Sequence, residues 1–112
     1  MLAAMPRQIS VAELAHMLTA GDPVLLLDVR QPWENETAQL PGSTLIPLPE
    51  LEERVSELEP PPGTLVVAYC HHGVRSLGAT AFLETQGIAS VVSLAGGIDA
   101  WSRQIDPTVP RY

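Results

Sequence analysis

Two continuous apolar runs stand out along the chain. Residues 24–27 read Val-Leu-Leu-Leu, and residues 65–69 read Leu-Val-Val-Ala-Tyr. A run without polar alternation is typical of a strand that is covered on both faces, as in a parallel sheet. Shorter apolar segments around Thr44–Ile46 and at residues 91–94 predict two more strands.

The segments between these runs carry helical signals. Ser10 and Glu13 form a capping box, which predicts a helix that Gly21 ends. Leucine and valine recur at helical spacing between residues 48 and 58, and the glutamates between them lie on the opposite, outer face. Further helices are expected over about residues 75–86 and in a short segment that opens at Gly96-Gly97 and contains Trp101, whereas residues 30–42 are expected to be irregular.

Strands and helices therefore alternate, which predicts an α/β fold with a mostly parallel central sheet and helices on both sides of it. With 112 residues, the chain is expected to form one domain, residues 1–112, around a single core. No internal repeat or low-complexity segment interrupts this pattern.

Composition and charge narrow the classes of function. The net charge of −7 argues against a nucleic-acid partner, because phosphates are met by clustered Lys and Arg. No apolar run reaches the length of a membrane span, and residues 1–10 lack the basic and apolar regions of a signal peptide. We therefore expect no membrane association and a cytoplasmic location. The acidic helix face is expected to be solvated, with docking of a basic partner as the alternative.

Cys70, the single cysteine, is either an inert buried thiol or a lone nucleophile. It follows the second long apolar run, at the carboxyl end of a predicted strand, where ligands bind in parallel sheets. Gly73 lets the following loop turn, and a helix is expected to begin beside Arg75. Backbone N–H groups of residues 71–76 and the helix N-terminus would then favour the thiolate over the thiol.

Such a thiolate can attack the outer sulfur of thiosulfate or a persulfide and carry it as a Cys70 persulfide. A thiol or cyanide would then accept the sulfur, so the reaction needs neither a metal nor an organic cofactor, and ping-pong kinetics are expected. A sulfur-carrier protein or a thioredoxin-like protein is a further candidate acceptor. We expect Arg75 to face an anion and the loop histidines, His71 and His72, to line the pocket mouth.

Four segments of this chain resemble the rhodanese family, in the family's order and over nearly the whole length. The resemblance implies a rhodanese-like sulfurtransferase with Cys70 as nucleophile and mainly structural roles for Asp28 and Arg30. It also implies that the loop binds the sulfur donor through His71, His72, Gly73, Val74, Arg75 and Ser76. The segments are Leu27–Arg30 with Pro32–Glu34, Leu40–Ser43, Tyr69–Ser76 and Ala95–Trp101.

The residues also allow other interpretations. A cysteine phosphatase is disfavoured, because its loop has five residues between cysteine and arginine and this chain has four, residues 71–74. A metal site is disfavoured as well, because adjacent residues such as Cys70 and His71 rarely aim at one ion. A catalytically silent binding or regulatory module stays as the main alternative. Trp33 and Trp101 are interpreted as packing anchors.

Overall fold

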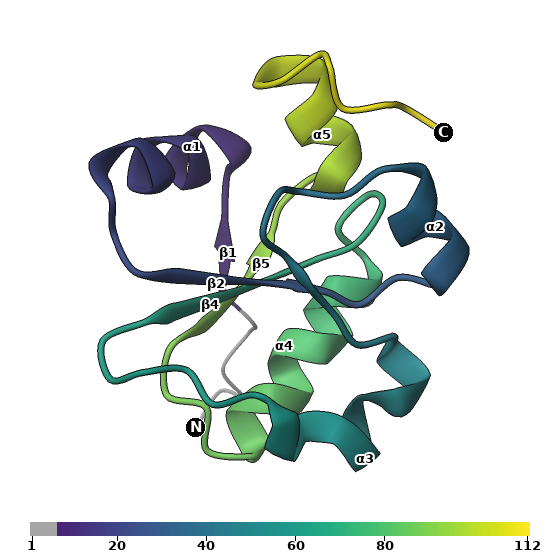
Figure 1. Ribbon diagram of the computed structural model, residues 1–112. Helices are drawn as coiled ribbons and strands as arrows, with labels where there is room; N and C mark the ends of the chain where they lie inside the picture. The colour runs from purple at the N-terminus through teal and green to yellow at the C-terminus, as the bar shows by residue number, and fades with distance from the viewer. Residues whose placement is uncertain (1–6) are drawn as a thin grey trace.

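The computed structural model describes residues 7–112, and its centre is a single five-stranded sheet (Figure 1). The strand order is β1-β5-β4-β2-β3, and every neighbouring pair is parallel. The predicted α/β class with a parallel sheet is therefore confirmed. The strands are β1 (Gln8–Ile9), β2 (Val24–Asp28), β3 (Thr44–Leu45), β4 (Leu65–Tyr69) and β5 (Val91–Leu94).

Helices cover both faces of the sheet, as the sequence predicts. Helices α1 and α5 lie on one face, and α3 and α4 lie on the other (Figure 1). The helices are α1 (Val11–Ala20), α2 (Pro32–Thr37), α3 (Leu51–Arg54), α4 (Arg75–Thr85) and α5 (Gly97–Gln104). Two short 3-10 turns, η1 (Leu48–Glu50) and η2 (Val55–Glu57), flank α3.

The central strands β2 and β4 explain the two continuous apolar runs. Val67 packs into the cluster under α1 and α5, whereas its neighbour Ala68 packs into the cluster under α4. Side chains alternate between the faces of a strand, so both faces of β4 need apolar residues. Leu26 and Leu27 of β2 divide between the two clusters in the same way.

Two expectations about local structure were wrong, and one strand was missed. Residues 30–42 were expected to be irregular but contain α2, which begins with Pro32 and is capped by Glu34 Oε1 accepting from the Gln31 N–H at 3.0 Å. The helix expected over residues 48–58 is divided into η1, α3 and η2, with a proline at the start of η1. The two-residue strand β1 was missed, because so short a segment carries no periodicity.

The two tryptophans differ in how deeply their side chains are buried. Trp101 is 8% exposed and belongs to the core under α1 and α5, which confirms its role as a packing anchor. Trp33 is 58% exposed, so the same expectation for Trp33 was wrong. The buried face of the short helix α2 is taken by Glu34 instead, and Trp33 makes an edge-on contact with Tyr112, with ring centroids 5.7 Å apart.

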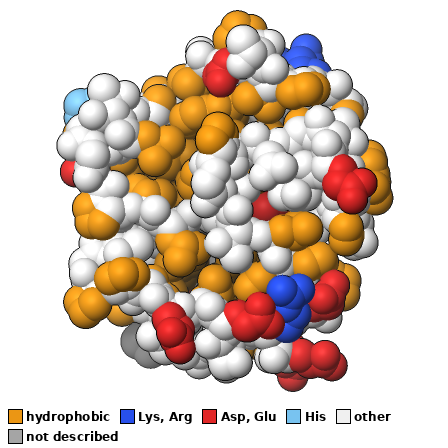
Figure 2. All heavy atoms as spheres, in the orientation of Figure 1, with side chains coloured by type: hydrophobic (Ala, Val, Ile, Leu, Met, Phe, Trp, Pro, Cys, Tyr) orange, Lys and Arg blue, Asp and Glu red, His pale blue; other side chains and the backbone are white. Residues whose placement is uncertain are grey.

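The acidic segment around α3 is solvated, as expected. All five of its glutamates are exposed, and Figure 2 shows acidic side chains gathered around a basic one near the α3 end of the molecule. Arg54 pairs there with Glu50 and Glu57. Within residues 7–112, no helix has the length and apolar character that crossing a membrane would require. The expectation about the start of the chain falls largely on residues 1–6, outside the described residues.

Candidate active site

Cys70 follows β4 directly, at the carboxyl ends of the central strands. It is 1% exposed and belongs to the core cluster on the α4 face. β4 pairs with β2 on one side and with β5 on the other, so the cysteine stands over the middle of the sheet. Residues 71–74 form the loop from Cys70 to the start of α4.

Polar groups of this loop and of α4 converge on the sulfur. The N–H groups of Gly73 and Ser76 lie 3.2 and 3.4 Å from Cys70 Sγ and donate to it. Ser76 is the second residue of α4, where backbone N–H groups have no partner within the helix. The Ser76 hydroxyl oxygen lies 3.5 Å from Sγ. The expected cradle of N–H groups therefore exists, built from two of the residues between 71 and 76.

The N-terminus of α5 holds the loop in this shape. The Ile98 N–H donates to the Cys70 carbonyl at 2.9 Å, and the Asp99 N–H donates to the His71 carbonyl at 3.0 Å. A Cβ at Gly97 would overlap both of these carbonyl groups, and Gly97 has a φ of +61°. Glycine is thus required here for the close approach of α5. Because N–H groups of α5 bind these two loop carbonyls, the loop keeps a shape in which its own N–H groups can face the sulfur.

Arg75 begins α4 and points to Glu34 of α2. Its two terminal nitrogens donate to the two Glu34 carboxylate oxygens at 2.6 and 2.8 Å. Hydrogen bonding to Arg75 is the main reason that the pKa of Glu34 falls to about 2, and the same pairing raises the pKa of Arg75. In the structure Arg75 thus faces a buried carboxylate of this chain; its contact with a donor anion stays a prediction.

The two loop histidines lie on the outer side of the site. The His71 ring stacks between Tyr112 and His72, with ring centroids 3.9 Å apart in each pair. Burial, followed by the neighbouring His72, lowers the pKa of His71, so the ring is mostly neutral at pH 7. His72 and Val74 are exposed beside it, so the loop presents one imidazole and one apolar side chain to solvent.

A buried network ties β2 to the surrounding loops, which confirms the structural role expected of Asp28 and Arg30. Arg30 is fully buried and donates to both Asp28 carboxylate oxygens, at 2.8 and 2.7 Å. It also donates to the Ala38 carbonyl and to the Tyr112 hydroxyl. The Tyr112 hydroxyl in turn donates to Glu34 at 2.6 Å. Burial first, and this bond second, raise the pKa of Tyr112 to about 12.

His71, His72 and Asp99 form a cluster that suits a charge network better than a metal site. One ligand atom from each lies within 4.8 Å of the others. The lone pairs of an imidazole lie in the ring plane, and two stacked rings do not direct them at one ion. The Asp99 oxygens already accept from Arg103 at 2.9 Å and from Arg111 at 3.1 Å.

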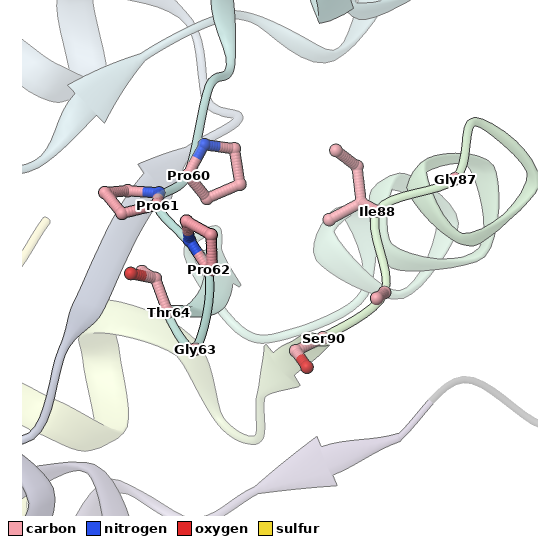
Figure 3. A pocket seen from close by; sticks show the side chains of 9 residues that line it. Pro60, Pro61, Pro62, Gly63, Thr64, Gly87, Ile88 and Ser90 are labelled. Atoms are coloured by element: carbon pink, nitrogen blue, oxygen red, sulfur yellow. The ribbon is translucent and has the colours of Figure 1, made fainter.

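A cavity of about 310 Å³ lies at the opposite end of the sheet (Figure 3). Residues 60–64, which precede β4, and residues 87–90, which precede β5, form its walls. The five-residue strand β4 separates it from Cys70. The three prolines lie on one side of this cavity and Ile88 lies on the other (Figure 3). We assign the cavity no part in the chemistry of the cysteine.

Three residues around the site were not identified as functional from the sequence. Glu34 lies in one of the segments that resemble the family, Pro32–Glu34, and a charged residue in such a segment is a usable signal. The Ser93 hydroxyl lies 2.7 Å from the Ser76 hydroxyl. A serine within an apolar strand is the sequence signal that could have indicated this contact. Tyr112 stacks on His71 from 41 residues further along the chain, and nothing in its local sequence indicated this.

Comparisons with known proteins agree with this geometry. The family model of the rhodanese-like domain matches residues 10–104. A sulfurtransferase from Allochromatium vinosum is 37% identical over 105 residues, which cover 94% of this chain and 96% of that protein. The chloroplastic rhodanese-like/PpiC domain-containing protein 12 of Arabidopsis thaliana is 39% identical over 95 residues, 81% of this chain. This chain spans only 31% of that longer relative.

A solved structure shows the same architecture. The crystal structure of a rhodanese-related protein from Thermoplasma volcanium superimposes with a TM-score of 0.80 and 33% identity, and the match covers 95% of this chain and 99% of that one. Family model, relative and structure agree over most of the chain, including the cysteine loop and the sheet that positions it. The chain therefore belongs to the rhodanese-like domain family.

Proposed function

We propose that this rhodanese-type sulfurtransferase carries sulfane sulfur as a persulfide on Cys70. The observation that supports it most is the position of Sγ at the end of β4, with the N–H groups of Gly73 and Ser76 donating to it at 3.2 and 3.4 Å. Such donors stabilise a sulfur anion, which is the reactive form of cysteine. The donors that suit this site are thiosulfate and small or protein-bound persulfides.

In the first step the Cys70 thiolate attacks the outer sulfur of the donor. A bond forms between Sγ and that sulfur, and the bond between the sulfur and the rest of the donor breaks. The bonding electron pair leaves with sulfite when the donor is thiosulfate, or with a thiolate when the donor is a persulfide. The enzyme is left with an anionic persulfide, and no proton transfer is required.

In the second step an acceptor thiolate or cyanide attacks the outer sulfur of the persulfide. The Cys70 thiolate leaves and is ready for another cycle, and the product is an acceptor persulfide or thiocyanate. The 112 residues contain one cysteine, so no second thiol of this chain can resolve the persulfide. We therefore propose an external acceptor: a small thiol, cyanide, or a sulfur-carrier or thioredoxin-like protein that docks over the exposed side of the loop.

Intact-protein mass spectrometry tests the proposal directly. The protein is incubated with thiosulfate, and separately with glutathione persulfide, and each sample is then treated with cyanide. We expect the wild type to gain the mass of one sulfur atom and to lose it to cyanide with release of thiocyanate. The Cys70→Ser variant is the control and should gain nothing.

Failure with both donors would reject sulfur transfer and favour the alternative, a catalytically silent binding module. An adduct that forms but resists cyanide would reject the second step alone. An equal mass gain on Cys70→Ser would show that the sulfur is held elsewhere, and the assignment of the nucleophile would be wrong.

A further inference from the structure

Ser93 places a hydroxyl inside an otherwise apolar strand. β5 reads Val-Val-Ser-Leu, and all four residues are buried. Side chains alternate along a strand, and Val91 packs into the cluster on the α4 face, so Ser93 points to that face as well. Its Oγ lies 2.7 Å from Ser76 Oγ, which lies 3.5 Å from Cys70 Sγ. The three atoms form a buried chain from β5 to the reactive sulfur.

The hydrogen atoms of this Ser93–Ser76–Cys70 hydrogen-bond chain all find an acceptor when the sulfur is ionised, but not when the sulfur is a thiol. Two contacts join the three atoms, and each contact accommodates one hydrogen. With a Cys70 thiolate there are two hydroxyl hydrogens, one for each contact. With a thiol there are three hydrogens, so one of them has no acceptor among these three atoms. Ser76 and Ser93 are fully buried and Cys70 is 1% exposed, so an unmatched hydrogen there costs free energy.

Ser93 determines the direction in which these hydrogens point. Among the hydrogen bonds of the described residues, the only partner of Ser93 Oγ is Ser76 Oγ. When Ser93 donates to Ser76, the hydrogen of Ser76 is left to point at the sulfur. A hydroxyl that accepts one hydrogen bond also donates a stronger one, because the bonds polarise each other.

We propose that Ser93 is a positioning residue that acts through Ser76 to hold the sulfur of Cys70 as a thiolate. Its relevance to catalysis depends on the proposed function, in which this thiolate attacks the sulfur donor. The two hydroxyls of this pair come from β5 and α4, the elements that pack against the loop. The pair acts in addition to the two backbone N–H groups that already face the sulfur.

Other charged and titratable groups near the loop are separate from this chain of hydroxyls. Within the described residues, none of their side chains makes a hydrogen bond to Sγ or to the two serine hydroxyls, so a substitution at Ser93 removes no hydrogen bond of theirs. These groups are His71 and His72 in the loop, Arg75 of α4, Glu34 of α2, Asp99 and Arg103 of α5, Arg111 and Tyr112 of the C-terminal segment, and Asp28, Arg30 and Tyr69 of the network around β2 and β4.

The test is the pH profile of Cys70 alkylation by iodoacetamide, which reports the thiolate fraction and needs no sulfur donor. Ser93→Thr and Ser93→Val form a matched pair, because both add the same bulk and only threonine keeps the hydroxyl. We expect the midpoint of the profile to rise in Ser93→Val, so that alkylation at pH values below it slows about two- to fivefold. Ser93→Thr is expected to retain the wild-type midpoint.

A double-mutant cycle separates action through Ser76 from general packing. Ser76→Ala should raise the midpoint more than Ser93→Ala does, and the double variant should match Ser76→Ala alone. Equal midpoints in Ser93→Thr and Ser93→Val, or additive shifts in the cycle, would overturn the proposal. Ser93→Ala also serves where valine prevents folding, because it adds no bulk. Since alkylation is independent of sulfur transfer, its outcome and that of the persulfide experiment can be told apart.

Discussion

The Glu34→Gln substitution would remove the charge that holds Arg75 beside the cysteine loop. Glu34 is 3% exposed, accepts from Arg75 at 2.6 and 2.8 Å and accepts from the Tyr112 hydroxyl at 2.6 Å. Glutamine keeps the shape of the side chain and one acceptor oxygen. The substitution therefore isolates the ionic part of the interaction between α2 and the start of α4.

The magnitude follows from the pKa of Glu34. Pairing with Arg75 is the main cause that lowers it from 4.5 to about 2, which corresponds to about 3 kcal/mol of stability at neutral pH. The Arg75 side chain is 36% exposed, so solvent screening reduces the expected value to about 1–2 kcal/mol. A carboxyl with a lowered pKa stabilises the fold above its unfolded value. This contribution is therefore full above about pH 5 and is lost as the pH falls from 4.5 towards 2.

Urea denaturation of the wild type and of Glu34→Gln between pH 2.5 and 7 measures the effect. We expect the difference in unfolding free energy to be largest at pH 7 and to shrink below pH 4.5. Glu57→Gln is the matched control, because Glu57 also pairs with an arginine through two hydrogen bonds but on the exposed surface. It should change stability little. A pH-independent loss in Glu34→Gln, or a loss equal to that of Glu57→Gln, would refute the reasoning.

Three further substitutions test the surroundings of the cysteine, and Gly87→Ala is the control for one of them. Arg75→Ala is expected to raise the KM for thiosulfate several-fold, and an unchanged KM would confine Arg75 to its pair with Glu34. Gly97→Ala should destabilise the protein by about 2 kcal/mol or more in urea and prevent persulfide loading, because its Cβ would overlap two loop carbonyls. Gly87→Ala, at φ +82° with no atom within 4 Å of the added Cβ, should cost only about 1 kcal/mol. Tyr112→Phe keeps the ring but loses two hydroxyl bonds, and denaturation should show a loss of about 1–2 kcal/mol.

The sheet could be predicted because its strongest signals are local. β2 and β4 are buried on both faces, so their apolar runs are continuous and easily distinguished from an amphipathic helix. β1 lacks such a signal, since its two residues form a strand only through pairing with β5. In α2, Pro32 and Glu34 were both visible as signals of a helix start, but the helix buries a glutamate, so no apolar stripe marked it.

The loop from Cys70 to Ser76 could be predicted for a similar reason, since its residues are contiguous and the glycine and helix start determine its course. Its partners could not be found in this way. Glu34 and Tyr112 meet Arg75 and His71 only after the chain has returned to the same edge of the sheet. Their contacts depend on tertiary packing, so the local sequence around either side chain does not identify its partner.

The contact of Ser93 could be predicted only in part from the sequence. Burying a hydroxyl in the middle of a strand costs free energy unless the hydroxyl finds a partner, so a serine flanked by Val92 and Leu94 already indicates a specific contact. The sequence does not identify that partner, because the register of β4 and β5 and the position of α4 determine which group meets the hydroxyl. Here that group is Ser76, the residue that also donates its N–H to the sulfur. A polar residue within a continuous apolar strand of such a sheet is therefore best searched for a contact with the site at the strand's carboxyl end.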